Sequence, residues 1–461
     1  MDYLTSERRS LIVGANEKVP LTNGEYVTGI NLDNAATTPP LKAVLKEVTE
    51  FIPWYSSVHR GTGYKSILSS DLYETGREII KDFVGADKTK DVVIYTKNTT
   101  ESINMLSYIL AQDNDRNTVV LSTRMEHLAN DLPWRDIFNT DYVQIDAVGR
   151  LVMSDLELKL KQHNGKVKLV TVTGASNVTG YKNPIYQIAC LAHKYGAKIL
   201  VDGAQLVPHA PVDMKEYGCS EHIDYLAFSA HKMYSPFGVG VLIGPKDTLE
   251  KYQPVYRGGG AVKLTSSEFV KWDDAPYKYE AGTPNVIGVA ALVAAIRTLK
   301  DIGMNKVDKS EKALIKYTVQ GLSGIPDLKL YCATENFAES IGIAAFDIPG
   351  IHHRLLAKIL AGEAGIAVRS GLFCAHPYVE RLLNITDEDL DYYKDHHEQP
   401  LPGLVRISLG LYNTYHEIDI LLDAVDWIVR NKKMCMEKYQ RHIAKEKSRE
   451  KRANIYRREV P

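Results

Sequence analysis

The chain has 461 residues, of which 25% are charged, and its formal net charge is −1. This length favours two domains over one simple core. The near-neutral charge gives no general reason to expect nucleic acid or an anionic membrane as a partner. The five cysteines, at positions 190, 219, 332, 374 and 435, form no CxxC pair. We therefore expect neither a disulfide framework nor a metal site. The apolar pattern indicates no leader or membrane-spanning segment, so the expected location is the cytoplasm.

Short apolar runs alternate with amphipathic segments from about residue 91 to residue 245. The runs DVVIYT, NTVVLST, VKLVTVTG, AKILVDG and IDYLAFS are typical of buried strands, and TTESINMLSYILA and NPIYQIACLAHKYG are typical of helices. This alternation predicts a mainly parallel sheet with helices on both faces. We assign it to a large domain, residues 31–290, that follows an N-terminal arm of residues 1–30.

A long helix is predicted over residues 288–312, and a smaller α/β domain over residues 291–430. The smaller domain carries the runs ESIGIAAFDI, HHRLLAKILAGE, GIAVRS and GLVRISLGLYN, with an acidic insertion near residues 378–403 before the last of them. A basic helical tail over residues 431–461 has eleven Lys and Arg against four Glu, a local net charge of +7. The tail is either a solvated helix or a docking segment for an acidic partner or nucleic acid.

Polar side chains follow the predicted strands at their carboxyl ends, where sheets of this kind bind ligands. They are Thr99 and Thr100, His127, Asn177, Asp202 with Gln205, and Lys232. Each alone has an ordinary explanation, such as a helix cap, a turn or a lysine that reaches water. Together they offer a phosphate site, an acid, a ring for stacking and a reactive amine, which are the groups that pyridoxal 5′-phosphate requires. No glycine-rich nucleotide motif competes with this interpretation.

The sequence also resembles fold-type I, class-V aminotransferase-like enzymes, above all their cysteine desulfurase and selenocysteine lyase branch. The resemblance covers roughly residues 28–430 and rests on NLDNAATTPP, VHRGTGY, NTTESIN, MEHLANDLPW, SNVTG, VDGAQ, FSAHKMYSPFGVG, YEAGTPN, RSGLFCAHP and RISLGLYNT. It implies an α/β fold with a mainly parallel seven-stranded sheet and a smaller C-terminal α/β domain. It further implies pyridoxal 5′-phosphate as the cofactor and a homodimer with shared active sites.

The resemblance gives each matching residue an expected role. Lys232 would bind the cofactor covalently and move protons, Asp202 would pair with the pyridine nitrogen, and His127 would stack on the ring and take part in catalysis. Asn177 and Gln205 would lie near the phenolic oxygen. The residues expected at the phosphate are Thr99, Thr100, Ser229, His231 and, from the other subunit, Thr283. Arg406 would clamp the substrate carboxylate, and Arg369 and Asn177 are further expected substrate neighbours. His59 and Arg60 are also expected beside the active site, either from the same subunit or from the partner.

Cys374 separates the reactions that the resemblance allows. In desulfurases a loop cysteine attacks the sulfur of the substrate cysteine, which leaves alanine and a persulfide on the enzyme, and only a thiolate does this well. RSGLFCAHP keeps that cysteine but has Leu372 and Phe373 where a histidine pair is usual, and MEHLAN has Leu128 where a second histidine is common.

We therefore expect a cysteine desulfurase or selenocysteine lyase that acts on an amino acid and passes sulfur to a possible acceptor protein. One alternative is another class-V aminotransferase, epimerase or lyase, in which Cys374 is a bystander. The other is a scaffold without catalysis that binds a partner through its tail.

Overall fold

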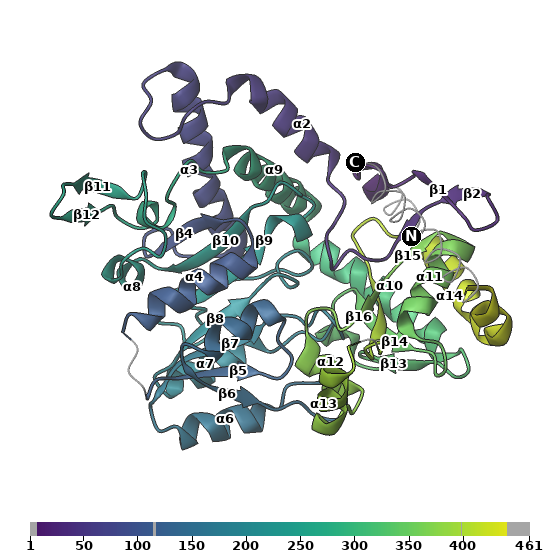
Figure 1. Ribbon diagram of the computed structural model, residues 1–461. Helices are drawn as coiled ribbons and strands as arrows, with labels where there is room; N and C mark the ends of the chain where they lie inside the picture. Colours follow the sequence, from purple (N-terminus) through teal and green to yellow (C-terminus); the bar gives the residue numbers. More distant parts are fainter. Residues whose placement is uncertain (1–6, 114–116, 398, 440–461) are drawn as a thin grey trace, which may run out of the picture.

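The computed structural model describes residues 7–113, 117–397 and 399–439, and Figure 1 shows a larger α/β part beside a smaller one. The larger part is built on a seven-stranded sheet in the order β4-β10-β9-β8-β7-β5-β6. Its strands are β4 (Asp91–Thr96), β5 (Val119–Thr123), β6 (Asn139–Val143), β7 (Val167–Thr173), β8 (Lys198–Asp202), β9 (Tyr225–Ser229) and β10 (Gly240–Pro245). Only β10 runs antiparallel to its neighbours. The predicted mainly parallel sheet is confirmed.

Strand β6 is the one strand of this sheet that carries no apolar run. Its sequence, NTDYV, is mostly half-buried or exposed. The strand at the other edge, β4, and the inner strands are buried along almost their whole length, and strands covered on both faces read as continuous apolar runs. The apolar runs of the sequence therefore identified β4, β5, β7, β8 and β9 and missed β6.

Helices cover both faces of the seven-stranded sheet, as Figure 1 shows. Val93 packs into a core with α2, α3, α7 and α9, whereas its neighbour Ile94 packs into a second core with α4. This alternation is the period of a strand with two buried faces. The helices of the larger part are α2 (Lys42–Phe51), α3 (Tyr64–Val84), α4 (Thr99–Ala111), α5 (Leu132–Arg135), α6 (Met153–Gln162), α7 (Ile185–Lys194), α8 (Lys246–Lys251) and α9 (Val286–Ile302).

The single helix predicted over residues 288–312 is wrong. The structure has two helices there, α9 and α10 (Met304–Ser323), which meet at Gly303. Gly303 has φ +88° and donates its backbone N–H to the carbonyl of Leu299. Glycine adopts this conformation without the penalty that a Cβ atom brings, so it ends one helix and turns the chain into the next.

The smaller part is a four-stranded antiparallel sheet covered by helices. The strands, in spatial order, are β13 (Lys329–Tyr331), β14 (Ile343–Asp347), β17 (Leu404–Ser408) and β16 (Arg369–Gly371). The helices α10, α11 (His353–Ala364) and α14 (Tyr415–Arg430) bury apolar side chains against it, among them Leu322, Leu356 and Leu421. The acidic segment between β16 and β17 forms α12 (His376–Leu382) and α13 (Asp387–Asp395).

The N-terminal residues join the two parts. A hairpin of β1 (Lys18–Pro20) and β2 (Tyr26–Thr28) is followed by β3 (Ile30–Asn31), which pairs in parallel with β15 (Ile366–Ala367). A second hairpin, β11 (Val262–Thr265) with β12 (Val270–Trp272), projects from the larger part (Figure 1). Residues 432–439 are helical, and the rest of the predicted basic tail lies outside the described residues. Among the described residues, no helix combines the length and apolar character that crossing a bilayer requires.

Gly180 provides a test of how the two parts pack. It has φ +74°, and a Cβ atom there would lie 2.5 Å from the carbonyl oxygen of Ile343 on β14. We expect Gly180→Ala to lower the free energy of unfolding by more than the about 1–2 kcal/mol that left-handed backbone costs a non-glycine residue. Gly24→Ala is the matched control, because Gly24 has φ +90° and open space around its Cβ position. Equal losses of stability in urea unfolding of the two variants would contradict the close packing.

Candidate active site

A cavity of about 530 Å³ lies at the carboxyl ends of the central strands and is lined by residues of both parts. It brings together twelve of the residues singled out in the sequence: Thr99, Thr100, His127, Asn177, Asp202, Gln205, Ser229, His231, Lys232, Arg369, Cys374 and Arg406. They come from positions as far apart as β4 and β17. Most of these residues had been selected because they follow the ends of predicted parallel strands, where sheets of this kind bind ligands.

Lys232 lies in the cavity because a short 3₁₀ helix, η3 (Ala230–Lys232), follows β9 without a loop. Burial lowers the pKa of Lys232 to about 8, with a further lowering by the nearby Arg406, although Asp202 and Cys374 partly oppose it. A lysine with this pKa is partly neutral near physiological pH. The amine can therefore act as a nucleophile or as a base.

Asp202 and Gln205 place buried acceptors in the cavity wall. The carboxylate of Asp202 accepts a hydrogen bond from the backbone N–H of Ala204 (2.9 Å), and burial raises its pKa while Lys232 opposes the shift. Gln205 donates through Nε2 to the carbonyl of Ala35 (2.8 Å), which leaves its buried Oε1 without a hydrogen-bond partner among the described residues. Buried acceptors of this kind call for donors on a ligand.

His127 stands beside these groups in the neutral form. Its Nδ1 accepts the backbone N–H of Ala129 (3.0 Å), so the ring proton belongs on Nε2. Burial lowers the pKa of His127 to about 4, and the cations Lys232 and Arg406 add to the shift. A neutral imidazole in this position can stack on a flat ring without adding positive charge.

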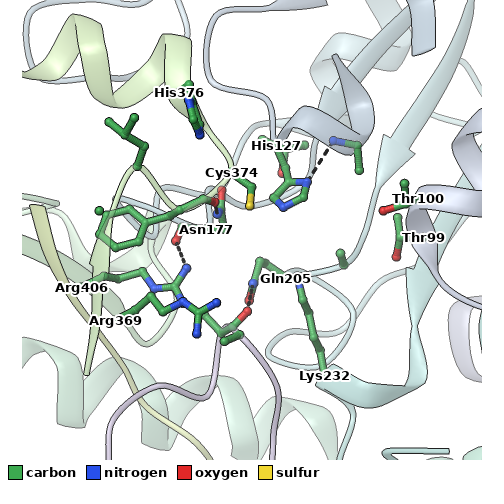
Figure 2. A pocket seen from close by; sticks show the side chains of 18 of the residues that line it. Thr99, Thr100, His127, Asn177, Gln205, Lys232, Arg369, Cys374, His376 and Arg406 are labelled. Carbon is green, nitrogen blue, oxygen red and sulfur yellow. Dashed lines mark hydrogen bonds between the residues drawn. The ribbon is translucent and has the colours of Figure 1, made fainter. Parts of the chain in front are cut away.

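One end of the cavity is formed by the N-terminus of α4. Figure 2 shows Thr99 and Thr100 there, with Arg369 and Arg406 on the other side of the cavity. The hydroxyl of Ser229 accepts the backbone N–H of Thr99 (2.8 Å) and lies 2.6 Å from its hydroxyl. A helix N-terminus surrounded by hydroxyl groups favours a phosphate.

The opposite end is formed by Arg406, which is buried on β17. It donates to the carbonyl of Asn177 (2.9 Å) and to the carboxylate of Asp33 (3.0 Å), and its buried Nε has no partner among the described residues. Arg369 reaches the second oxygen of Asp33 (3.5 Å). Burial lowers the pKa of Arg406 to about 10, although Asp33 raises it. Two guanidinium groups held by one carboxylate leave positive charge available for the carboxylate of an amino acid.

Cys374 is exposed on the loop between β16 and α12. Phe373 and Cys374 both have left-handed backbone, with φ +51° and +52°, which costs a non-glycine residue about 1–2 kcal/mol. Hydrogen bonds from the larger part hold this loop: Leu128 N–H donates to the carbonyl of Cys374 (2.7 Å), and Asn177 Nδ2 donates to that of Phe373 (2.8 Å). Figure 2 shows the sulfur of Cys374 near His127. The side-chain amide of Asn177 thus donates to the backbone of the Cys374 loop, a contact that the sequence did not indicate.

Two carboxylates near the site were not singled out in the sequence, although both stand in quoted segments. Asp33, in NLDNAATTPP, directly follows the β3 pairing and orients Arg406. Glu126, in MEHLAN, accepts hydrogen bonds from Thr173 N–H (3.0 Å) and Asn130 Nδ2 (2.6 Å), and burial raises its pKa to about 8. The position of Glu126, directly before His127 in the sequence, was the available signal.

Thr283, His59 and Arg60 do not line the cavity of this chain. His59 Nε2 instead lies 2.8 Å from the carboxylate of Glu74, and Arg60 donates to the carbonyl of Val262 (3.4 Å). Their expected roles involve a partner subunit and stay predictions.

Pyridoxal 5′-phosphate fits the residues that are present. Lys232 supplies the amine, the buried carboxylate of Asp202 lacks the donor that a pyridine N–H provides, and the α4 terminus offers the phosphate end. The unpaired Oε1 of Gln205 is a further polar group left for the ligand.

Comparison with known proteins agrees with this chemistry. The sequence profile described as Aminotransferase class-V matches residues 30–421. A probable cysteine desulfurase from Halalkalibacterium halodurans is 35% identical, over 86% of this chain and 92% of its own length. A cysteine desulfurase from Haloferax volcanii is 33% identical, over 92% of this chain and 95% of its own.

Solved structures show the same similarity. The apo structure of a cysteine desulfurase from Thermococcus onnurineus has a TM-score of 0.78 and 31% identity, and the match covers 87% of this chain and 95% of that one. A cysteine desulfurase from Escherichia coli has a TM-score of 0.77 and 28% identity, over 92% and 98% of the two chains.

The lowered pKa of Lys232 predicts how the apoprotein binds its cofactor. Covalent attachment of pyridoxal 5′-phosphate requires the neutral amine, so its rate should rise with pH through about 8 and then level off. An ordinary lysine would continue to gain reactivity up to about pH 10.4. Stopped-flow absorbance of apoprotein mixed with the cofactor, followed by borohydride reduction and peptide mapping, measures both the rate and the site.

Asp202→Asn provides the control for this pH profile. Removing the carboxylate that raises the pKa of Lys232 should move the midpoint to lower pH. A midpoint near pH 10 in the parent, or labelling at another lysine, would contradict the assignment.

Proposed function

The chain belongs to the class-V aminotransferase family, and from this premise we propose that it is a pyridoxal 5′-phosphate-dependent cysteine desulfurase. It converts L-cysteine to L-alanine and retains the sulfur as a persulfide on Cys374. The observation that carries the proposal is the position of Cys374, on a loop that lines the same cavity as Lys232 and Arg406. Relatives named as cysteine desulfurases, at 33% and 35% identity over most of the chain, support it.

The substrate is oriented by its carboxylate. Arg406 has a buried Nε that no described residue engages, and its position is fixed by Asp33 and by the carbonyl of Asn177. Arg369 adds a more exposed guanidinium on the neighbouring strand β16. A planar guanidinium binds a carboxylate through two parallel hydrogen bonds, so this pair fixes which way the amino acid points.

Proton transfer is assigned to Lys232. Its amine is close to half-protonated near pH 8, so it can accept a proton from the substrate Cα and return one later in the cycle. The cofactor, when bound, supplies the electron sink that makes this Cα proton acidic. Asp202 maintains that sink because its buried carboxylate favours a protonated pyridine nitrogen.

Sulfur transfer is assigned to Cys374. Its thiolate attacks the substrate sulfur, an S–S bond forms, and the bond between that sulfur and the substrate Cβ breaks. The sulfur remains on Cys374 as a persulfide, and the carbon skeleton leaves as alanine after protonation. His127 is neutral near physiological pH, so its ring forms no ion pair with the thiolate of Cys374.

Selenocysteine is a second candidate substrate. The side chains that precede Cys374 are the apolar Leu372 and Phe373, and Leu128 stands after His127. Selenium leaves carbon more readily than sulfur and needs less help from a thiolate, so a site without extra histidines suits it. Product analysis with both amino acids separates the two.

Replacement of Cys374 tests the proposed reaction. Cys374→Ala should reduce alanine formation from L-cysteine by about two orders of magnitude or more, because the nucleophile is lost. The cofactor absorbance should remain, since Lys232 and Asp202 are unchanged. Alanine release with dithiothreitol as reductant is the assay, and Cys190→Ala, which changes a free cysteine outside the cavity, is the control. Equal turnover in the parent and Cys374→Ala would transfer the assignment to another class-V reaction.

We further propose that the working form is a homodimer in which Thr283 and His59 face the partner's cavity. Large apolar side chains stay exposed in the segment around His59, namely Trp54, Tyr55 and Tyr64, and the rings of Trp54 and Tyr64 lie 6.1 Å apart. Exposed aromatic groups gathered in one region are typical of protein interfaces.

Mixing of subunits tests the shared site. Lys232→Ala should be inactive, and Thr283→Ala should need several-fold more cofactor for half activity because a phosphate hydrogen bond is lost. If Thr283 acts across the interface, mixed dimers of the two variants contain one complete site and should regain activity at limiting cofactor. Without cross-subunit action, mixing restores nothing, and size-exclusion chromatography with light scattering reports whether mixed dimers formed.

A further inference from the structure

A second and larger hollow lies on the opposite side of α12 from the active-site cavity. This groove has a volume of about 1470 Å³ and is lined by residues of the larger part, such as Arg124 and Arg150, and by β13, α12 and α13 of the smaller part. Figure 1 shows α12 and α13 between the β6 side of the large sheet and the β13–β14 side of the small one. The groove is well above the range of about 300–1,000 Å³ that is typical of small-molecule sites.

Four cations in the groove have no ion-pair partner among the described residues. They are Arg124, Arg150, Lys329 and Arg381. A fifth, Arg135, is already engaged by Asp131 through its Nε (2.9 Å). The groove also contains carboxylates, at Asp146, Glu335, Glu380 and Asp387. Asp146 is turned to its own loop, where it accepts the N–H groups of Val148 (3.0 Å) and Arg150 (2.8 Å).

Three of these cations are held against tyrosine rings. The guanidinium of Arg124 lies 4.3 Å from the ring centre of Tyr142, and that of Arg150 lies 5.1 Å from Tyr181. Lys329 lies 4.8 Å from Tyr331. The Nε–H groups of Arg124 and Arg150 are buried and donate to no partner among the described residues. Stacking fixes the direction of a cation without neutralising it, so these groups remain available to an anionic ligand.

Like charges also crowd at one point of the groove. Arg381 and Arg135 both lower the pKa of Arg124, in addition to the larger effect of burial. Mutual repulsion among guanidinium groups is relieved when an anion lies between them. Asp131 and Tyr142 offset part of this repulsion at Arg124, and an acidic side chain of a ligand would offset more of it.

The groove is connected to the active site through α12. His376, the first residue of this helix, lines the cavity that contains Cys374, whereas Pro377 and Arg381 line the groove. Seven residues of α-helix span about 10 Å. Tyr378 is buried and donates to the carbonyl of Gly149 (2.6 Å), which fixes α12 to the loop that carries Arg150. A macromolecule seated in the groove would have part of its surface at the mouth of the cavity.

We propose that this groove is the docking site for an acidic segment of the protein that accepts sulfur from Cys374. The inference rests on the proposed function and names the chemistry of its partner: a reactive cysteine flanked by several Asp or Glu side chains. The acceptor thiolate attacks the outer sulfur of the Cys374 persulfide, the S–S bond breaks, and Cys374 leaves as a thiolate. The persulfide then resides on the acceptor, with no net oxidation or reduction.

The test uses the holoenzyme and two short synthetic peptides, each with one cysteine. One peptide has Asp and Glu around the cysteine, and the other has Asn and Gln in the same positions. Fluorescence anisotropy measures binding, and alanine formation from L-cysteine with each peptide as the sulfur acceptor measures transfer. The acidic peptide should bind about tenfold more tightly. This preference should fall when ionic strength rises from about 0.01 M to about 0.15 M, which shortens the Debye length from about 30 Å to about 8 Å.

Variants locate the effect in the groove. Arg381→Gln changes an exposed side chain, and together with Arg124→Gln it should weaken binding of the acidic peptide by about tenfold. Lys316→Gln removes an exposed cation on α10, outside the groove, and should leave binding unchanged. If Arg124→Gln impairs folding, Arg381→Gln alone should still weaken binding several-fold. Turnover with dithiothreitol should be unchanged in all of these variants.

The possible outcomes are distinct. Equal binding of the two peptides, or equal loss in Lys316→Gln, would overturn the docking site. Displacement of the acidic peptide by micromolar inorganic phosphate would also overturn it, because the groove would then be a site for a small oxyanion. Anisotropy requires no turnover, so it reports on the groove even where no alanine forms. Turnover with dithiothreitol reports on the proposed function even where no peptide binds.

Discussion

The structure depends on one buried cation, Arg406. Its guanidinium projects from the small sheet and binds the carbonyl of Asn177 on the larger part and the carboxylate of Asp33 at the end of the N-terminal arm. A charge in this position is costly unless it is paired. The three segments must therefore meet correctly for the protein to avoid that cost, and the cavity forms where they meet. Arg406 also adds to the effect of burial in lowering the pKa values of Lys232 and His127, so the same residue contributes to the protonation state of the site.

The cavity contains more positive than negative charge before any ligand binds. Among the described residues, Lys232, Arg369 and Arg406 lie near the carboxylates of Asp33 and Asp202. Burial is the main reason that His127 is neutral, and the cations Lys232 and Arg406 add to that effect. A cofactor phosphate at one end and a substrate carboxylate at the other would supply the missing negative charge. Both ligands would then be bound by this excess of positive charge, whereas burial is the main reason that the amine of Lys232 is partly neutral.

The sequence predicted the parts of this site that depend on local pattern. Buried parallel strands read as apolar runs, and the residue after each run is recognisable, as at Asp202 and Lys232. It did not predict what depends on distant pairing. Asp33 is unremarkable until β17 places Arg406 against it, and β6 has no apolar signature because its side chains are mostly half-buried or exposed. At Gly303 the local pattern was misleading: it predicted one continuous helix, whereas the backbone of Gly303 ends α9 and α10 begins after it.

The loop that carries Cys374 is fixed by contacts with both parts of the structure. Two consecutive residues with left-handed backbone are unfavourable by themselves, and the loop retains this shape because Leu128 and Asn177 bind its carbonyl groups. Leu128 and Asn177 belong to the larger part. The position of Cys374 therefore depends on the packing of the two parts against each other, to which Arg406 also contributes. On its other side the loop continues into α12, whose buried Tyr378 is bonded to Gly149 and Thr179. Cys374 is therefore held from both directions. A loop fixed in this way would let an acceptor gain access to the sulfur by reaching the cysteine and not by displacing it.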